Sequence, residues 1–563
     1  MPATVRELVE VQAALRPQAL YALDADAATH LTFGELAQSC RRVAALLQSR
    51  GSQPGDTVSL VMPNGLVTLQ LLLGAMHGGW CVNPVNLLSQ PEQMRYVLGH
   101  SDCKLVFVSP EWEASVRAAL EGVDRAVSVV VIDPHSAAQG STSISVTPVH
   151  PVTPVHPVTP VHPVIPAKAG IHPALIAVDP GFRRDDESRR ADAGVCRDGG
   201  WRRLDPGFFR DDRDVPGRVA LLMYTSGTTG MPKGVMLSHA NLAANAHAIS
   251  AEHALTPSDR VLAVLLLYHI NAFAVTMLAP LAHGGSLVMP RKFSAARFWA
   301  QAASGECTWL NVVPTMISYL LEGATPPRAQ TARLRFCRSA SAALPPEHHR
   351  AFEAKFGIGI IETMGLTETV APAFSNPLNE AQRKLGSVGL ASGCEAQVID
   401  ANLAPVPDGL TGEIAIRGPN VMQGYYRDEV ATRATFTAHG WLRTGDLGHR
   451  DADGFFFVTG RIKELIIKGG ENIAPREIDE ALLRHPAVLD AAAVGIPDRH
   501  YGQEIMACVV LRAGHDADEA GLREFCAAQL GRYKTPKLFR FVKDLPRGPS
   551  GKVQRLKLVD LAG

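Results

Sequence analysis

Along most of the chain, short apolar runs alternate with longer segments in which apolar residues recur every three or four positions. DTVSLVMP (56–63) is typical of a buried strand, and LVTLQLLLGAMHGG (66–79) after it has the length of a helix and ends in glycine. The same pairing recurs in TWLNVVP and PTMISYLLEG (308–323). Strands that alternate with helices predict an α/β fold with largely parallel sheets.

The chain after residue 460 has a different order of elements. KELIIKGGENIAPREIDEALLRHPAVLDAAAVGI (463–496) predicts strand, turn, strand, helix and strand, which is typical of a small α+β domain. We therefore expect a large N-terminal α/β domain with several subdomains at 1–459 and a small C-terminal α+β domain at 460–563.

Residues 146–216 interrupt the alternation. The six-residue unit TPVHPV is written three times (147–164), and DPGFRRDD (179–186) has a near-copy in DPGFFRDD (205–212). Prolines every three residues favour polyproline II, and a segment so poor in apolar residues cannot offset its ordering entropy. We expect a disordered or loosely held insertion of roughly seventy residues, longer than an ordinary loop. Its evenly spaced histidines form no fixed metal cage in an extended chain, and its deletion should leave catalysis largely intact.

Two further segments bear on the cellular compartment. Residues 261–282 are long and uncharged enough for a membrane span, but Tyr268, His269 and Asn271 lie in the middle and Pro280 follows. A buried strand, a polar loop and a core helix is the better interpretation. The N-terminus has no basic segment followed by an apolar run, so we predict no signal peptide and a cytoplasmic protein.

The overall composition narrows the classes of function. The 563-residue chain is 46% hydrophobic and 20% charged, with 55 Lys+Arg balanced by 55 Asp+Glu, so neither nucleic acid nor an anionic membrane is indicated as a partner. Its nine cysteines are scattered without a CxxC pair, which argues against a disulfide framework or a structural zinc site. Cys81 and Cys337 are better interpreted as small buried apolar residues than as catalytic thiols.

The most chemically suggestive stretch is YTSGTTGMPKG (224–234), which follows the apolar strand VALLM. A loop of small and hydroxylated residues can turn its backbone N–H groups around an anion, and Lys233 adds a cation. It is not a Walker A loop, because that motif places Ser or Thr after Gly-Lys, whereas Pro232 precedes Lys233 and Gly234 follows it. The stretch predicts a phosphate-binding loop.

Five segments in order resemble the adenylate-forming superfamily, which includes acyl-CoA synthetases, carrier-protein adenylation domains and firefly luciferase. They are TSGTTGMPKG, ETMGLTET (362–369), GWLRTGDLG (440–448), GRIKELIIKGGENIAPREID (460–479) and PRGPSGKVQR (546–555). The resemblance covers nearly the whole chain outside residues 146–216. It implies an AMP-forming acid–thiol ligase, with ATP, Mg²⁺ and CoA as co-substrates and a hinge between the two domains.

The resemblance also implies roles for individual residues. Thr367 would contact the α-phosphate, Glu368 would bind Mg²⁺, and Lys552 would be the catalytic lysine. The residues it assigns to ATP or AMP are Thr225, Ser226, Gly227, Thr228, Thr229, Gly230, Lys233, Met364, Asp446 and Arg461.

The remaining assignments concern the hinge, CoA and the acyl group. Lys463 would be the pivot of the hinge, Gly469 and Gly470 would border the CoA channel, and His269 would be the gate between that channel and the acyl pocket. The residues expected to line the acyl pocket are Asn271, Val313, Ser341, Ala342 and Gly365.

The residue types suit the chemistry of adenylation. A carboxylate attacks the α-phosphorus of ATP while pyrophosphate leaves, so two anions must approach and positioned positive charge does most of the catalysis. Loop amides and Lys233 hold phosphates, a hard cation such as Mg²⁺ prefers the oxygens of Glu368, and Lys552 supplies a compact point charge. A lysine so close to the end of the chain can reach the site only if the small domain closes over it.

The chain departs from the pattern in two places. Met364 stands where most relatives have an aromatic residue that stacks on adenine; a polarizable thioether can still cover the base. Ala340 stands where glycine is common, which would narrow the floor of the acyl pocket.

SNPLNEAQRKLGSVG (375–389) and FSAARFW (293–299) resemble the branch with oxalyl-CoA synthetases and carnitine-type CoA ligases. A dicarboxylate would require a cation or strong donor deep in the pocket, and LYHINAF (267–273) offers only Asn271 among apolar neighbours. The sequence analysis therefore favours an apolar or mildly polar acyl group, such as a fatty acid.

Alternatives to an acyl-CoA synthetase stay open at this point. They are a free-standing enzyme that loads a carrier protein, an oxalate- or carnitine-type CoA ligase, a luciferase-like oxygenase and a non-catalytic remnant.

Overall fold

The computed structural model describes residues 1–562 except residue 28 and the segments 135–214, 226–230 and 549–551. The insertion predicted at 146–216 lies, apart from its last two residues, outside the described part of the chain.

One sheet of the large domain carries the predicted phosphate loop. Its order is β18-β8-β7-β4-β3-β5-β6, with parallel pairing from β7 to β6 and antiparallel pairing of β7, β8 and β18. The strands are β3 (Thr57–Val61), β4 (Cys81–Pro84), β5 (Leu105–Val108), β6 (Ser128–Val131), β7 (Val219–Thr225), β8 (Lys233–Ser238) and β18 (Gly424–Tyr425).

A second sheet of the large domain runs β15-β14-β13-β12-β11-β9-β10-β1-β2. Its centre, from β13 to β1, is parallel, and antiparallel strands close both edges. The strands are β1 (Leu20–Asp24), β2 (His30–Thr32), β9 (Arg260–Leu262), β10 (Ser286–Met289), β11 (Trp309–Val312), β12 (Phe336–Ser339), β13 (Ile360–Met364), β14 (Phe374–Ser375) and β15 (Leu390–Ala391).

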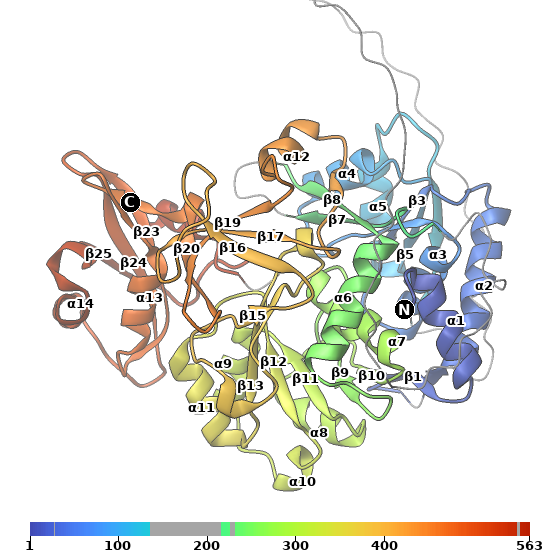
Figure 1. The fold of residues 1–563 in the computed structure, drawn as a ribbon, viewed down its shortest axis with the longest axis horizontal. Helices are drawn as coiled ribbons and strands as arrows, with labels where there is room; N and C mark the ends of the chain where they lie inside the picture. The colour runs from blue at the N-terminus through green and yellow to red at the C-terminus, as the bar shows by residue number, and fades with distance from the viewer. Residues whose placement is uncertain (28, 135–214, 226–230, 549–551, 563) are drawn as a thin grey trace, which may run out of the picture. The chain divides into compact units, whose positions relative to one another are not determined.

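Helices of the large domain pack on these sheets; α1, α2 and α3 contact one another, as do α6 and α7 (Figure 1). They are α1 (Val5–Leu15), α2 (Phe33–Ser49), α3 (Leu66–His77), α4 (Pro91–His100), α5 (Glu113–Leu120), α6 (His239–Glu252), α7 (Ala279–His283), α8 (Phe298–Ser304), α9 (Pro314–Glu322), α10 (Arg328–Thr331) and α11 (Pro346–Phe356), with the short 3₁₀ helices η1 (Pro110–Trp112) and η5 (Glu380–Gln382).

Local sequence explains where these elements begin and end. Thr32 caps α2, since its hydroxyl accepts from the backbone N–H of Glu35 at 3.2 Å while the Glu35 carboxylate accepts from Thr32 in return. Helix α3 is buried along its whole length, which accounts for a segment that is apolar on every face.

The uncharged segment 261–282 is a core element, as the sequence analysis predicted. It comprises the end of β9, a loop, the π-helix η3 (Ala272–Leu278) and the start of α7. Within the described residues, no helix combines the length and the hydropathy that crossing a membrane requires.

A third, antiparallel sheet follows, and then the small domain. The third sheet runs β16-β17-β19-β20, and the C-terminal sheet runs β22-β21-β24-β23 with β25 beside β24 (Figure 1). Their elements are β16 (Glu395–Ile399), β17 (Gly412–Arg417), α12 (Glu429–Thr435), β19 (Leu442–Arg450), β20 (Phe456–Arg461), η6 (Ile462–Glu464), β21 (Ile466–Lys468), β22 (Glu471–Ile473), α13 (Pro475–Leu483), β23 (Val488–Asp498), β24 (Gly502–Leu511), α14 (Glu519–Lys534), β25 (Leu538–Phe541), α15 (Arg555–Leu558) and η7 (Val559–Leu561).

The predicted fold class is confirmed: a large α/β domain with parallel sheets precedes a small α+β domain. The strand–turn–strand–helix–strand order predicted for residues 463–496 is the observed order β21, β22, α13, β23. Cys81 and Cys337 are buried, and burial raises the pKa of both thiols well above the ordinary value, as expected for apolar core residues.

Candidate active site

A cavity of about 560 Å³ lies where several of the predicted site residues meet. Residues that follow the carboxyl ends of β11, β12 and β13 form one side of it, which is where parallel sheets place their ligands. Of the predicted residues, those that line the cavity are Val313, Ser341, Ala342, Met364, Gly365, Asp446, Arg461 and Lys552. The structure therefore unites the predicted acyl pocket with part of the predicted nucleotide site.

The ends of the predicted phosphate loop are held as a hairpin. Thr225 closes β7 and pairs with Lys233, the first residue of β8. The Thr225 hydroxyl donates to the carbonyl oxygen of Lys233 at 3.5 Å. Between them, the predicted Ser226, Gly227, Thr228, Thr229 and Gly230 lie outside the described residues.

Thr367 and Glu368, predicted for the α-phosphate and Mg²⁺, lie in the 3₁₀ helix η4 (Thr367–Thr369). One carboxylate oxygen of Glu368, Oε1, accepts a hydrogen bond of 2.9 Å from the Tyr425 hydroxyl. The Lys233 ammonium lies 4.7 Å from the centre of the Tyr425 ring. Sequence analysis missed Tyr425, although the aromatic pair in QGYYRDE (423–429) was a signal that could have been examined.

Asp446, Arg461 and Lys552 form a charged group at another side of the cavity. Adjacent strands β19 and β20 pair Asp446 with Arg461, whose Nε donates to Asp446 Oδ1 at 2.7 Å. Burial raises the pKa of Asp446, whereas the positive charges of Arg461 and Lys552 oppose that shift. Lys552 keeps exposed surface, yet desolvation by the surrounding protein, assisted by Arg461, lowers its pKa. The predicted ribose and catalytic residues are thus brought together.

Two residues of β13 face the cavity beside this group. Met364, predicted to cover adenine, is half-buried at the end of the strand. Glu362, two residues earlier on the same face, is buried and accepts from the backbone N–H of Leu344 at 3.2 Å. Burial raises the pKa of Glu362 to about 7, while Arg476 opposes the shift. Sequence analysis did not single out Glu362, although a carboxylate inside an apolar strand is a recognisable signal.

A buried arginine lies behind the acyl end of the cavity. Arg338 of β12 is fully buried, and its Nη1 donates to Oδ1 of Asn271 at 2.7 Å and to Oδ1 of Asn311 at 2.8 Å. Nδ2 of Asn271 in turn donates to Oγ of Ser341 at 3.3 Å. A chain of hydrogen bonds therefore leads from the Arg338 guanidinium to a hydroxyl that lines the cavity.

The expectation of an apolar acyl group rested on residues 267–273 alone. These residues contain no lysine or arginine, whereas the buried Arg338 lies on β12 behind them. Asn271 lies one step behind the cavity wall rather than in it, because its amide contacts Ser341. Ser341 itself has φ +75°, a left-handed conformation unfavourable for a residue with a side chain.

The residues predicted for the hinge and CoA lie elsewhere. Lys463 is exposed in η6, and Gly469 and Gly470 form the turn between β21 and β22 at φ +57° and +87°. His269 is half-buried, with its ring 4.6 Å from that of Tyr268. None of the four is among the described residues that line the cavity, where Lys552 is found instead.

Comparison with known proteins gives a consistent result. The model of a family described as AMP-binding enzyme matches residues 9–426, and that of its C-terminal domain matches residues 477–552. A sulfoacetate–CoA ligase of Cupriavidus necator is 52% identical over 99% of this chain and 98% of its own. An oxalate–CoA ligase of Arabidopsis thaliana is 32% identical over 95% and 94%. The crystal structure of ATP-bound MatB from Rhodopseudomonas palustris matches with a TM-score of 0.80 at 28% identity and covers 100% of both chains.

Proposed function

The chain belongs to the AMP-binding enzyme family, and from that premise we propose that it ligates CoA to short carboxylic acids that carry a second anionic group. The coarser activity, ATP-dependent and AMP-forming ligation of an acid to CoA, follows from the family and from the 52% identical relative. The class of acid is the part that we propose, and the observation that supports it is the buried charge of Arg338.

A charge buried without a counter-ion is costly. Arg338 makes no ion pair with a carboxylate of the described residues, and its Nε and Nη2 have no hydrogen-bond partner among them. Burial lowers the pKa of Arg338 to about 9, which still leaves the guanidinium protonated at neutral pH. Because desolvation of a lone cation costs several kcal/mol, roughly 3–5 when a buried partner is removed, such a residue is retained for an anion that arrives with the ligand.

The orientation of the hydrogen bonds transmits this charge to the cavity. Arg338 donates to the amide oxygen of Asn271, which fixes the Asn271 nitrogen as a donor toward Ser341. The Ser341 oxygen therefore accepts, and its own O–H remains available to donate into the cavity. Donors aligned in one direction polarise one another, so the wall at Ser341 favours an anionic group.

The two named relatives support the same substrate class. Sulfoacetate carries a sulfonate beside its carboxylate, and oxalate carries a second carboxylate. The hydrogen-bond network of Arg338 and the substrates named for the two relatives are independent observations, because the network is seen in the structure of this chain and the substrates are named for other proteins.

The chain's residues then have distinct roles in two steps. In the first, a carboxylate oxygen of the acid bonds to the α-phosphorus of ATP and the bond to pyrophosphate breaks. Lys552 offsets the negative charge where the two anions meet, Asp446 and Arg461 hold the ribose, and Lys233 holds the outer phosphates. Glu368 suits Mg²⁺, since its carboxylate has an oxygen besides the one bonded to Tyr425; when bound, the ion supplies charge neutralisation on the phosphates.

In the second step, the CoA thiol attacks the acyl carbonyl of the mixed anhydride and AMP leaves. We propose that the small domain turns about Lys463, so that Lys552 leaves the cavity and the Gly469–Gly470 turn borders the path of the thiol. His269 remains a candidate for the gate on that path.

A panel of acids tests the proposal. Pyrophosphate release and CoA thioester formation are measured with sulfoacetate, oxalate, acetate, propionate and hexanoate at equal concentration. We expect sulfoacetate to be the best substrate and hexanoate the worst. Preference for hexanoate would restore the fatty-acid hypothesis, and CoA-independent release alone would favour a carrier-loading enzyme.

A further inference from the structure

We propose that Tyr425 is a positioning residue that keeps Lys233 and Glu368 apart, so that the lysine stays available to phosphate and the carboxylate to Mg²⁺. The inference rests on the phosphate and metal roles proposed above for these two residues. It does not depend on which acid is the substrate.

The side chain of Tyr425 contacts both charged residues at once. Its hydroxyl donates to Glu368 Oε1 at 2.9 Å, and its ring lies 4.7 Å from the Lys233 ammonium. Both residues are described, and no ion pair within 4.0 Å joins them. The aromatic ring therefore acts as a spacer with one attractive contact at its face and another at its hydroxyl.

Without the Tyr425 ring between them, Lys233 and Glu368 could form a direct ion pair. Lys233 and Glu368 are long, opposite charges on neighbouring elements, β8 and η4, which contact each other. A direct ion pair would neutralise the lysine needed by the phosphates and occupy carboxylate oxygens needed by the metal. A hydrogen bond from a neutral phenol, in contrast, leaves the Glu368 carboxylate charged and fixes its orientation.

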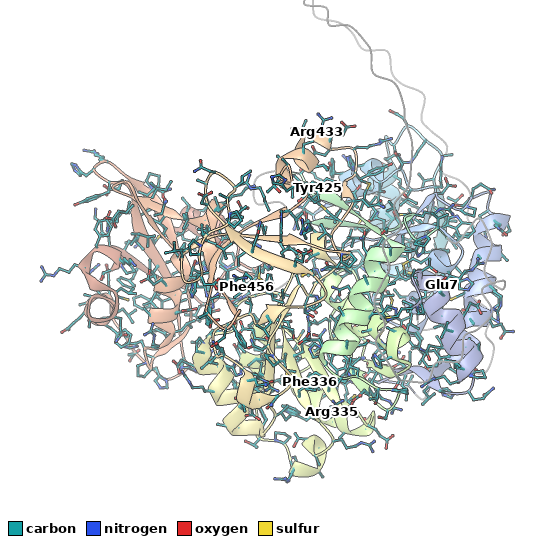
Figure 2. The ribbon with its side chains drawn as sticks, viewed as in Figure 1. Glu7, Arg335, Phe336, Tyr425, Arg433 and Phe456 are labelled. Atoms are coloured by element: carbon teal, nitrogen blue, oxygen red, sulfur yellow. The ribbon has the colours of Figure 1, made fainter. Side chains whose placement is uncertain are left out.

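Backbone contacts fix the position of Tyr425, which is labelled in Figure 2. It is buried, its strand β18 pairs with β8, and its backbone N–H donates to Oγ1 of Thr432 at 2.9 Å. The preceding Met422 donates its N–H to the carbonyl oxygen of Glu368 at 2.8 Å. One short segment thus ties the strand of the phosphate loop to the segment of the predicted metal ligand.

The next residue provides a matched control. The hydroxyl of Tyr426 points to Asp102, with a hydrogen bond of 2.7 Å to Oδ2, and its ring lies 5.7 Å from that of His100. Tyr426→Phe therefore removes a phenol hydroxyl from the same segment without touching Lys233 or Glu368.

The test compares Tyr425→Phe with Tyr426→Phe in the full chain. Mn²⁺ binding to the ATP complex is followed by its paramagnetic signal without any acid, and the Mg²⁺ dependence of pyrophosphate exchange is measured with the best acid. We expect Tyr425→Phe to lower the affinity for Mn²⁺ on the order of tenfold, as for loss of a hydrogen bond to a charged group. Metal-free ATP affinity should change less than about twofold, because the ring remains over Lys233.

Tyr426→Phe should leave metal binding unchanged. Tyr425→Leu should weaken the binding of Mn²⁺ and also the binding of ATP in the absence of metal, since the ring and the hydroxyl are lost together. Unchanged Mn²⁺ binding in a folded Tyr425→Phe protein would overturn the proposal, as would equal weakening in both phenylalanine variants. Because the binding assay contains no acid, its outcome is separable from an error in the proposed substrate class.

Discussion

A buried charge lies near each end of the cavity, and the two charges differ in whether they have an ion-pair partner. At the nucleotide end, Asp446 is 3% exposed and paired with Arg461 at 2.7 Å. At the proposed acid end, Arg338 is 0% exposed, and its hydrogen bonds within the described part of the chain go to the side-chain amides of Asn271 and Asn311. This difference motivates the proposal above: the paired Asp446 would orient neutral ribose hydroxyls, whereas the unpaired charge of Arg338 would favour a ligand with an anionic group.

The largest effect that separates the two ends is expected from Arg338→Met. Removal of the cation that polarises Asn271 and Ser341 should lower kcat/KM for sulfoacetate by about a hundredfold, equivalent to ~2.7 kcal/mol, as for loss of hydrogen bonding that involves a charged group. The melting temperature should not fall, because an uncompensated buried charge has been replaced by an apolar side chain of similar length. Steady-state kinetics and thermal unfolding check both results.

Arg335 of the preceding segment is the matched control for that variant. It is partly exposed, contacts Asp259 and lies over the Phe336 ring (Figure 2). Arg335→Met should lower the melting temperature and leave kcat/KM for sulfoacetate within about twofold. If Arg338→Met behaves in the same way, Arg338 is structural and the comparison of the two ends fails.

The second prediction concerns a substitution at the proposed nucleotide end of the cavity. Asp446→Asn should raise KM for ATP on the order of 30-fold, or about 2 kcal/mol, because a charged acceptor is lost beside Arg461. The melting temperature should fall by about 3 °C, since Arg461 loses its buried partner. The ratio of kcat/KM between sulfoacetate and propionate should be unchanged; a changed ratio would mean that the two ends are not independent.

The third prediction concerns the last link of the donor chain. Ser341→Gly removes the hydroxyl and suits φ +75°, so kcat/KM for sulfoacetate should fall about tenfold while the protein becomes about 1 kcal/mol more stable. Steady-state kinetics measure the expected fall in kcat/KM, and denaturant unfolding measures the expected rise in stability. A loss of stability without a loss of specificity would indicate a purely structural serine.

The last prediction concerns the stability of the fold at acid pH, which limits the pH range in which the two ends can be compared. Burial lowers the pKa of His253 to about 3 and those of His239 and His283 to about 4. The unfolded chain binds these protons first, so stability is intact above pH 6.5 and declines as pH falls toward 4. Each histidine contributes up to ~1.4 kcal/mol per pH unit. Denaturant unfolding at pH 7, 6 and 5 should show this decline, and constant stability down to pH 5 would contradict it.

The fold class was predicted from sequence, and the cavity brings together Asp446, Arg461 and Lys552, which the sequence analysis expected at the nucleotide site. Paired patterns such as 56–63 with 66–79 follow from local periodicity, and they appear as β3 and α3. Asp446 and Lys552 belong to ordered segments that resemble a known family, so their positions could be assigned one by one. Such assignments need no knowledge of long-range contacts.

Arg338 and Tyr425 contact partners that the sequence does not place beside them. Arg338 stands in a short buried strand, where the charge between Cys337 and Ser339 was a visible anomaly. Asn311 lies beside it because β11 pairs with β12, and Asn271 reaches it from the start of η3. Tyr425 reaches Lys233 because β18 pairs with β8 across a long separation in the chain. Tertiary pairing, not local pattern, creates both contacts.

The most direct test of the central claim is the ratio of kcat/KM for sulfoacetate to that for propionate, measured in the wild-type protein and in Arg338→Met. Propionate lacks the second anionic group but is similarly short. We predict a ratio well above one for the wild type that falls by about a hundredfold in the variant, because the donor chain through Asn271 and Ser341 loses its positive charge. A wild-type ratio below one, or the same ratio in both proteins, would contradict it.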